Sequence, residues 1–158
     1  MNDERYIHYS EAPLLTALYN KCQDDASCAK PNGLWFSVER ERANDGWRDW
    51  CVAEKYRPEA LTYVAELELD ESRICRITSA CELDAFDEQY TAPLFNGFVV
   101  HYIDWRKVAE KFAGIIIAPY IWERRLRGEA SGWYYGWDCA SGCVWDASAV
   151  NILEDANR

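Results

Sequence analysis

Three tryptophans stand close together in the sequence and are candidates for binding a ligand. Trp35, Trp47 and Trp50 fall within sixteen residues, in a segment of turns, a short apolar run and a polar loop. Aromatic rings beside a loop suit the wall of a pocket that binds a flat ring. Aromatic side chains also dominate hydrophobic cores, so packing alone explains them equally well. His8 is a further candidate because it stands where a predicted strand meets a predicted helix, and the alternative is a half-buried histidine with satisfied ring nitrogens.

The cysteines and histidines do not form a known metal motif. The spacings Cys22/Cys28, Cys75/Cys81 and Cys139/Cys143 are wider than the close pairs of structural zinc sites. Because the histidines are few and the number of cysteines is odd, we expect no metal site and reduced thiols. A Cys/His nucleophile pair fits the residue types but has no motif behind it. The one cysteine outside these pairs is Cys51, and the histidines of the sequence are His8 and His101.

Composition and charge narrow the class of protein. A chain of 158 residues fits one domain, residues 1–158, and 49% hydrophobic with 15% aromatic residues exclude a disordered chain. No apolar run approaches the length of a membrane span, and the charged start Met1–Arg5 lacks an apolar signal region, so a cytoplasmic protein is expected. The net charge of −10 disfavours broad nucleic-acid binding. The basic cluster at 123–127 fits either a site for an acidic group or a solvated face.

The elements that must position these residues follow from periodicity and capping signals. Leu61–Leu69 alternates with period two, as a half-buried strand does, and Ser79 with Glu82 forms a capping box at the start of a helix. The same signals predict strands over 5–9, 34–38, 61–69, 74–77, 115–118, 133–137 and 143–152, and helices over 10–22, 47–55, 79–90 and 104–113. Residues 121–128 are ambiguous. Strands and helices in this mixed order indicate a compact α+β domain.

Three separated pieces of the chain resemble the ADP-ribosyltransferase superfamily, the NAD-using fold of bacterial toxins and poly-ADP-ribose polymerases. They are His8-Tyr9-Ser10, then Gly33-Leu34-Trp35-Phe36-Ser37 with Trp47 and Trp50-Cys51 after a loop, and then Gly142-Cys143-Val144-Trp145-Asp146 running on to Val150-Asn151. These match, in order, the family's strand histidine motif, its Gly-Leu-Tyr-Phe-Ala segment and its last strand. The general shape also looks like a small phage-type anti-CRISPR transferase of this superfamily. The resemblance implies a split, mixed β-sheet core of about six strands with surrounding helices and His8 near the centre.

The resemblance also implies NAD as substrate and roles for five residues. His8 orients a ribose hydroxyl and Tyr9 supplies backbone contacts to the carboxamide. Trp35 and Trp50 match the family's two stacking tyrosines, and Ser37 faces the same pocket. Cleavage of the bond between ribose and nicotinamide makes the ribose oxocarbenium-like, and a nearby carboxylate stabilises that charge.

The catalytic carboxylate is where the sequence departs from the family. Ser141 stands at the position aligned with the family's Glu, and Asp138 is the nearest carboxylate, so Asp138 is the expected catalytic residue together with His8. Asp138 is also a plausible turn residue. Glu39 and Glu41 are further candidates for orienting a substrate, although surface carboxylates on a loop are the commoner explanation.

Three functions are compatible with these residues. The first is a mono-ADP-ribosyltransferase, a phage or bacterial effector, toxin or inhibitor that modifies a cytosolic macromolecule, with a protein acceptor favoured over nucleic acid. The second is a catalytically degenerate module that binds NAD, ADP-ribose or a protein partner. The third is an acidic interaction protein whose tryptophans belong to the core.

Overall fold

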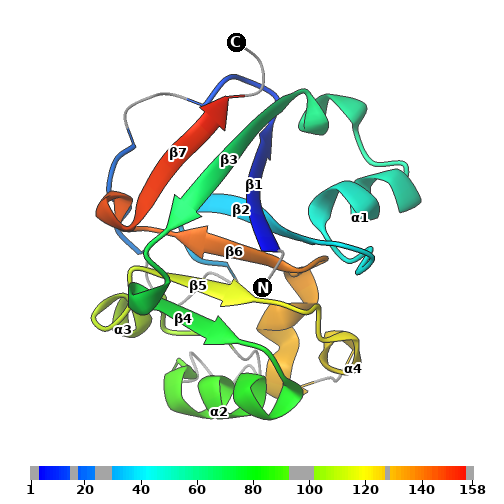
Figure 1. Ribbon diagram of the computed structural model, residues 1–158. Helices are drawn as coiled ribbons and strands as arrows, with labels where there is room; N and C mark the ends of the chain where they lie inside the picture. The colour runs from blue at the N-terminus through cyan, green and yellow to red at the C-terminus, as the bar shows by residue number, and fades with distance from the viewer. Residues whose placement is uncertain (1–3, 15–17, 24–29, 93–101, 127–128, 156–158) are drawn as a thin grey trace.

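The computed structural model describes residues 4–14, 18–23, 30–92, 102–126 and 129–155. Strands and helices follow one another along this part of the chain (Figure 1). The strands are β1 (Glu4–Ser10), β2 (Leu34–Arg40), β3 (Tyr63–Leu69), β4 (Ile74–Ile77), β5 (Gly114–Ile117), β6 (Ser141–Val144) and β7 (Val150–Asp155). The helices are α1 (Trp47–Ala53), α2 (Ala80–Tyr90), α3 (Trp105–Ala109) and α4 (Trp122–Arg125), with 3₁₀ segments at Pro58–Leu61, Glu71–Arg73, Glu129–Gly136 and Ala147–Ala149.

One mixed sheet organises the described chain, which confirms the predicted α+β class. Its seven strands stand in the order β4-β5-β6-β2-β1-β3-β7, where about six were predicted. β4 and β5 run parallel, and every other neighbouring pair is antiparallel. The strands form a single hydrogen-bonded series rather than two separate sheets, and β1, with His8, lies next to the central strand β2.

The sheet opens between β1 and β2. The two strands pair from Glu4 with Arg40 as far as Ile7 with Ser37. β1 then continues along β3 until Ser10 lies opposite Tyr63, while β2 continues along β6. The last residues of β1 and the first residues of β2 therefore diverge, and the space between them is available to side chains of both strands.

The hydrophobic core lies at the end of the sheet formed by β4, β5 and β6. All residues of β5 and β6 are buried. Helices α2 and α3 flank this end of the sheet (Figure 1). Leu83, Phe86 and Tyr90 of α2 are buried at helical spacing, and Ser79 caps the helix by accepting a hydrogen bond from the Glu82 amide, as predicted. No helix in the described ranges is long and apolar enough to cross a membrane.

The helix predicted over residues 10–22 is wrong. The described residues 11–14 and 18–23 are not helical. Ser10 remains in β1, and its hydroxyl donates to the Ala12 carbonyl instead of capping amides. The Lys21 amide donates to the Trp145 carbonyl 2.9 Å away, so a tertiary contact replaces the helical hydrogen bond.

The strand predicted over residues 133–137 is also wrong. This run belongs to the 3₁₀ segment Glu129–Gly136, and the Trp137 amide donates to the Tyr134 carbonyl at 2.9 Å. Trp133, Tyr134 and Trp137 are almost completely buried, whereas Tyr135 is 58% exposed. Burial at these positions follows a helical repeat rather than the alternation of a strand.

Candidate functional site

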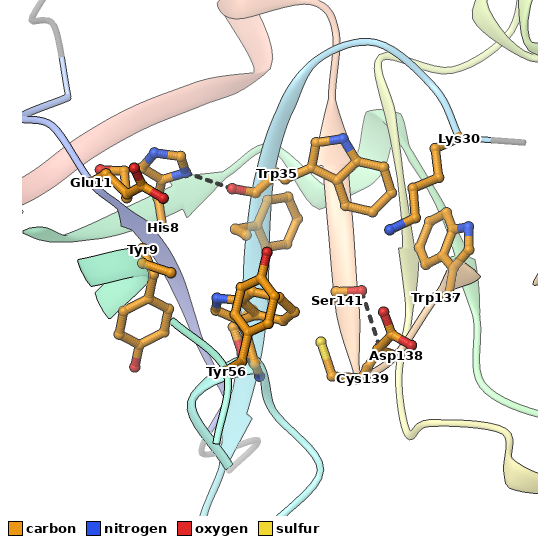
Figure 2. A pocket seen from close by; sticks show the side chains of 15 residues that line it. His8, Tyr9, Glu11, Lys30, Trp35, Tyr56, Trp137, Asp138, Cys139 and Ser141 are labelled. Carbon is orange, nitrogen blue, oxygen red and sulfur yellow. Dashed lines mark hydrogen bonds between the residues drawn. The ribbon is translucent and has the colours of Figure 1, made fainter. Parts of the chain in front are cut away.

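A pocket of about 330 Å³ opens where β1 and β2 diverge (Figure 2). Its walls come from the end of β1, from β2, from α1 and the turn after it, and from the loop that leads into β6. The described residues that line it are His8, Tyr9, Ser10, Glu11, Lys30, Trp35, Phe36, Ser37, Trp47, Tyr56, Ala60, Trp137, Asp138, Cys139 and Ser141. Six of these residues are aromatic, counting Tyr9 and Tyr56, so the pocket suits a planar ligand.

His8 spans the gap between the two diverging strands. Its Nδ1 lies 2.6 Å from the Trp35 carbonyl oxygen. Because a carbonyl oxygen only accepts, Nδ1 carries the hydrogen of this bond. In the neutral ring Nε2 is then an acceptor, which can receive a hydrogen bond from a hydroxyl group of a ligand.

The aromatic walls come from four tryptophans, of which three line the pocket. Trp35 packs edge-on against Trp137, with ring centroids 4.8 Å apart. Trp47 also lines the pocket, and Trp50 stacks on Trp47 with ring centroids 5.0 Å apart and 11° between the planes. Trp50, predicted as a stacking residue of the pocket, is therefore not among the residues that line it.

A hydrogen-bond network explains why Trp47 takes the place predicted for Trp50. Ser37 is buried, its hydroxyl donates to Glu39 Oε1 at 2.8 Å, and it accepts from the Trp47 amide at 2.8 Å. This bond holds the first turn of α1 against β2, so the first tryptophan of the helix faces the pocket. The Tyr9 hydroxyl also donates to Glu39 Oε1, at 3.3 Å. Burial, and then the nearby Glu39 carboxylate, raise the pKa of Tyr9 to about 12.

Asp138 lines the pocket on the side opposite His8 (Figure 2). Its Oδ1 lies 3.6 Å from Nη2 of Arg125, and about a quarter of its side chain is exposed. Ser141, at the position aligned with the family's Glu, is buried, and its hydroxyl donates to the Cys139 carbonyl at 3.0 Å. Among the described lining residues, Asp138 and Glu11 are the carboxylates, and Glu11 is paired with Arg57.

The two other predicted carboxylates lie outside this lining. Glu39 contacts the pocket through the hydroxyls of Ser37 and Tyr9 rather than directly. Glu41 is exposed on the loop after β2 and lies 3.4 Å from Arg42. Glu39 therefore supports the pocket walls, whereas Glu41 is a surface residue.

The cysteine that lines the pocket is poorly suited to act as a nucleophile. Cys139 lines the pocket, but burial raises its pKa to about 12, so it is a thiol at neutral pH. Within the described residues, no group of three or more His, Cys, Asp or Glu side chains could hold a metal ion. His101 and Cys28 lie outside the described ranges.

Several lining residues were not predicted from the sequence. Trp137 was assigned to a strand, although its place in the run Trp-Tyr-Tyr-Gly-Trp before Asp138 is visible in the sequence. Trp47 belonged to the tryptophan cluster but was matched to a serine of the family. Lys30 and Tyr56 join the pocket through tertiary contacts, which no local pattern reveals.

Comparison with models of protein families, with curated proteins and with solved structures finds no match to this chain. Any proposal of function for this chain therefore rests on its residues and their geometry.

Proposed function

We propose that this protein is a mono-ADP-ribosyltransferase that uses NAD as substrate and modifies a macromolecule. One observation carries the proposal. The three pieces of sequence that resemble the superfamily lie on β1, β2 and β6, which are neighbours in the sheet in the order β6-β2-β1. His8 of the first piece and Trp35 of the second line one pocket together with Ser141 and Asp138, which precede the third piece by one and four residues.

The pocket offers a role for each part of the nicotinamide riboside group. The nicotinamide ring would stack on the aromatic side chains of the lining, among which are Trp35 and Trp47. The backbone at Tyr9, where β1 has left β2, would hold the carboxamide. His8 Nε2 would accept a hydrogen bond from a ribose hydroxyl, because Nδ1 is occupied by the Trp35 carbonyl.

The proposed reaction needs a group that stabilises positive charge. The bond between the ribose C1′ and the nicotinamide nitrogen breaks, and nicotinamide leaves with the electron pair of that bond. The ribose becomes oxocarbenium-like, and a nucleophile of the acceptor attacks C1′ and loses its proton. Asp138 is the lining carboxylate on the side opposite His8, and its negative charge would stabilise the transition state.

The net charge favours one class of acceptor, and the resemblance suggests the setting in which the protein acts. A net charge of −10 favours a protein acceptor over a nucleic acid, whose phosphates it would repel. The resemblance to the superfamily implies an effector, toxin or inhibitor of phage or bacterial type that acts in the cytoplasm.

The test is incubation of the purified protein with labelled NAD, with and without a cell lysate. The expected result is release of nicotinamide and transfer of label to a macromolecule, and both activities should be lost in His8→Ala. Lys111→Gln, remote from the pocket, is the matched control. NAD that neither binds nor turns over would refute the proposal.

A second candidate is a module that binds NAD or ADP-ribose without catalysis. Two observations favour it: Ser141 replaces the family's Glu, and Asp138 is already paired with Arg125. Saturable binding of NAD without nicotinamide release would establish this alternative.

A further inference from the structure

Arg125 forms an ion pair with Asp138, but not all of its hydrogen-bond donors have an acceptor among the described residues. Its guanidinium carbon lies 5.9 Å from the ring centroid of Trp122 and 6.0 Å from that of Tyr135, two rings that are mostly exposed. The distance of 3.6 Å to Asp138 is an ion pair and not a hydrogen bond. The buried Nε has no hydrogen-bond partner in the part of the chain that the structure describes. A group with five donors is thus held in position with few acceptors.

Lys30 is a second available cation on the same side of the pocket. Its ammonium lies 5.1 Å from the ring centroid of Trp35, and Figure 2 shows the side chain beside Trp35 and Trp137. No ion pair joins Lys30 to another described residue, and it is the one Lys or Arg among the described lining residues. Two cations are therefore available near Asp138: Lys30 lies within the pocket lining, and Arg125 is paired with Asp138 from outside it.

We propose that Arg125 and Lys30 form a phosphate subsite beside Asp138, and that a bound phosphate draws Arg125 away from Asp138. A guanidinium binds phosphate through paired, charge-assisted hydrogen bonds, which are stronger than its present contact at 3.6 Å. The rings of Trp122 and Tyr135 keep the guanidinium at the edge of the pocket while it exchanges partners.

This exchange of partners by Arg125 has a consequence for catalysis. The consequence rests on the proposed function. While Arg125 is paired with Asp138, it partly neutralises the carboxylate that would face the oxocarbenium-like ribose. A substrate that carries a diphosphate would release Asp138 from this pair. The subsite therefore selects a nucleoside diphosphate over a nucleoside and makes Arg125 a positioning residue for Asp138.

Binding of inorganic pyrophosphate, measured by titration calorimetry, tests the subsite without NAD. Arg125→Gln and Lys30→Gln should each weaken binding by about tenfold, because each removes a charged donor. Two matched controls should bind like the wild type: Arg124→Gln, whose guanidinium is bound by Asp84, and Lys111→Gln, whose ammonium lies 5.2 Å from the Phe112 ring. Wild-type protein without pyrophosphate affinity, or equal affinity in all variants, would overturn the subsite.

A kinetic comparison tests the release of Asp138 and separates the two proposals. Arg125→Gln should lower kcat/KM for NAD by about tenfold or more, and should leave kcat/KM for nicotinamide riboside unchanged or higher. Equal losses with both substrates would overturn the exchange of partners. If pyrophosphate binds through Arg125 and Lys30 but NAD releases no nicotinamide, the proposed function fails and the subsite remains.

Discussion

The family's catalytic Glu combines a position on the strand with a negative charge, and in this chain Ser141 has the position whereas Asp138 has the charge. Ser141 stands at the position aligned with the family's Glu but carries no charge, and its hydroxyl is bonded to the Cys139 carbonyl. Asp138 carries the charge and lines the pocket from the loop before β6. At the scale of single residues, catalysis would therefore depend on a carboxylate from the loop rather than from the strand.

Asp138→Ala should abolish transfer and leave NAD affinity nearly unchanged. The positive charge that Asp138 faces exists only in the transition state, so its loss lowers turnover by roughly a hundred- to a thousandfold. Nicotinamide release and equilibrium binding of NAD should be measured side by side. Ser141→Ala is the matched control and should keep its activity, and transfer by Asp138→Ala at the wild-type rate would refute the assignment.

The two tryptophans of α1 should respond differently to removal. Trp47→Ala should weaken NAD binding by roughly 1–3 kcal/mol, because it removes one stacking plane of the pocket. Trp50→Ala should instead lower the free energy of unfolding, by up to about 3 kcal/mol, because Trp50 packs behind Trp47. Urea unfolding and NAD titration of both variants check the assignment, which fails if Trp50→Ala loses more affinity than Trp47→Ala.

At the scale of elements, the pocket depends on how α1 is attached to β2. The Ser37 hydroxyl joins the Trp47 amide to the Glu39 carboxylate. Ser37→Ala leaves both groups without this partner in a partly buried place, so the free energy of unfolding should fall by about 1 kcal/mol or more. NAD affinity should fall as well, since the Trp47 wall loosens. Ser72→Ala, which removes an exposed hydroxyl bonded to Asp70, is the control and should change neither quantity.

The strands could be predicted from the sequence more fully than the helices and turns. The run Leu61–Leu69 keeps its predicted alternation, because Ala65 and Leu67 of β3 are buried whereas Glu66 and Glu68 are not. Residues 10–22 carry a helical pattern, but the Lys21 amide bonds to Trp145. Such a distant partner cannot be inferred from a local pattern.

The site, like the fold, has residues that could be predicted from the sequence and others whose place depends on tertiary contacts. His8 was predicted from its position at the end of a predicted strand, Trp35 and Asp138 from the resemblance to the superfamily, and the structure places all three around one pocket. Trp47 and Trp50 are three residues apart on one helix, so the sequence does not say which one faces the ligand. The bond from the Trp47 amide to Ser37 decides it.

At the scale of the whole molecule, burial of tyrosines sets an alkaline limit to stability. Burial raises the pKa of Tyr6 and Tyr120 to about 12, and that of Tyr134 further. A raised pKa means that the folded state prefers the neutral phenol. Stability is therefore fully present below the unfolded pKa of about 10 and is lost as pH rises through 10 towards 12.

Tyr120→Phe and Tyr134→Phe should separate this effect from hydrogen bonding. The Tyr120 hydroxyl is buried and has no partner within the described residues, so its removal should cost little at neutral pH and should make the alkaline loss of stability shallower. The Tyr134 hydroxyl accepts from the Ile121 amide at 3.0 Å, and its removal leaves that amide unpaired, which should cost about 1–3 kcal/mol at neutral pH. Urea unfolding at a series of pH values from about 7 to 11 measures both effects. Tyr120→Phe removes an ionisable hydroxyl and breaks no hydrogen bond among the described residues. A change in the alkaline slope would therefore come from the lost titration of this phenol, and an unchanged slope would show that Tyr120 does not contribute to the alkaline limit.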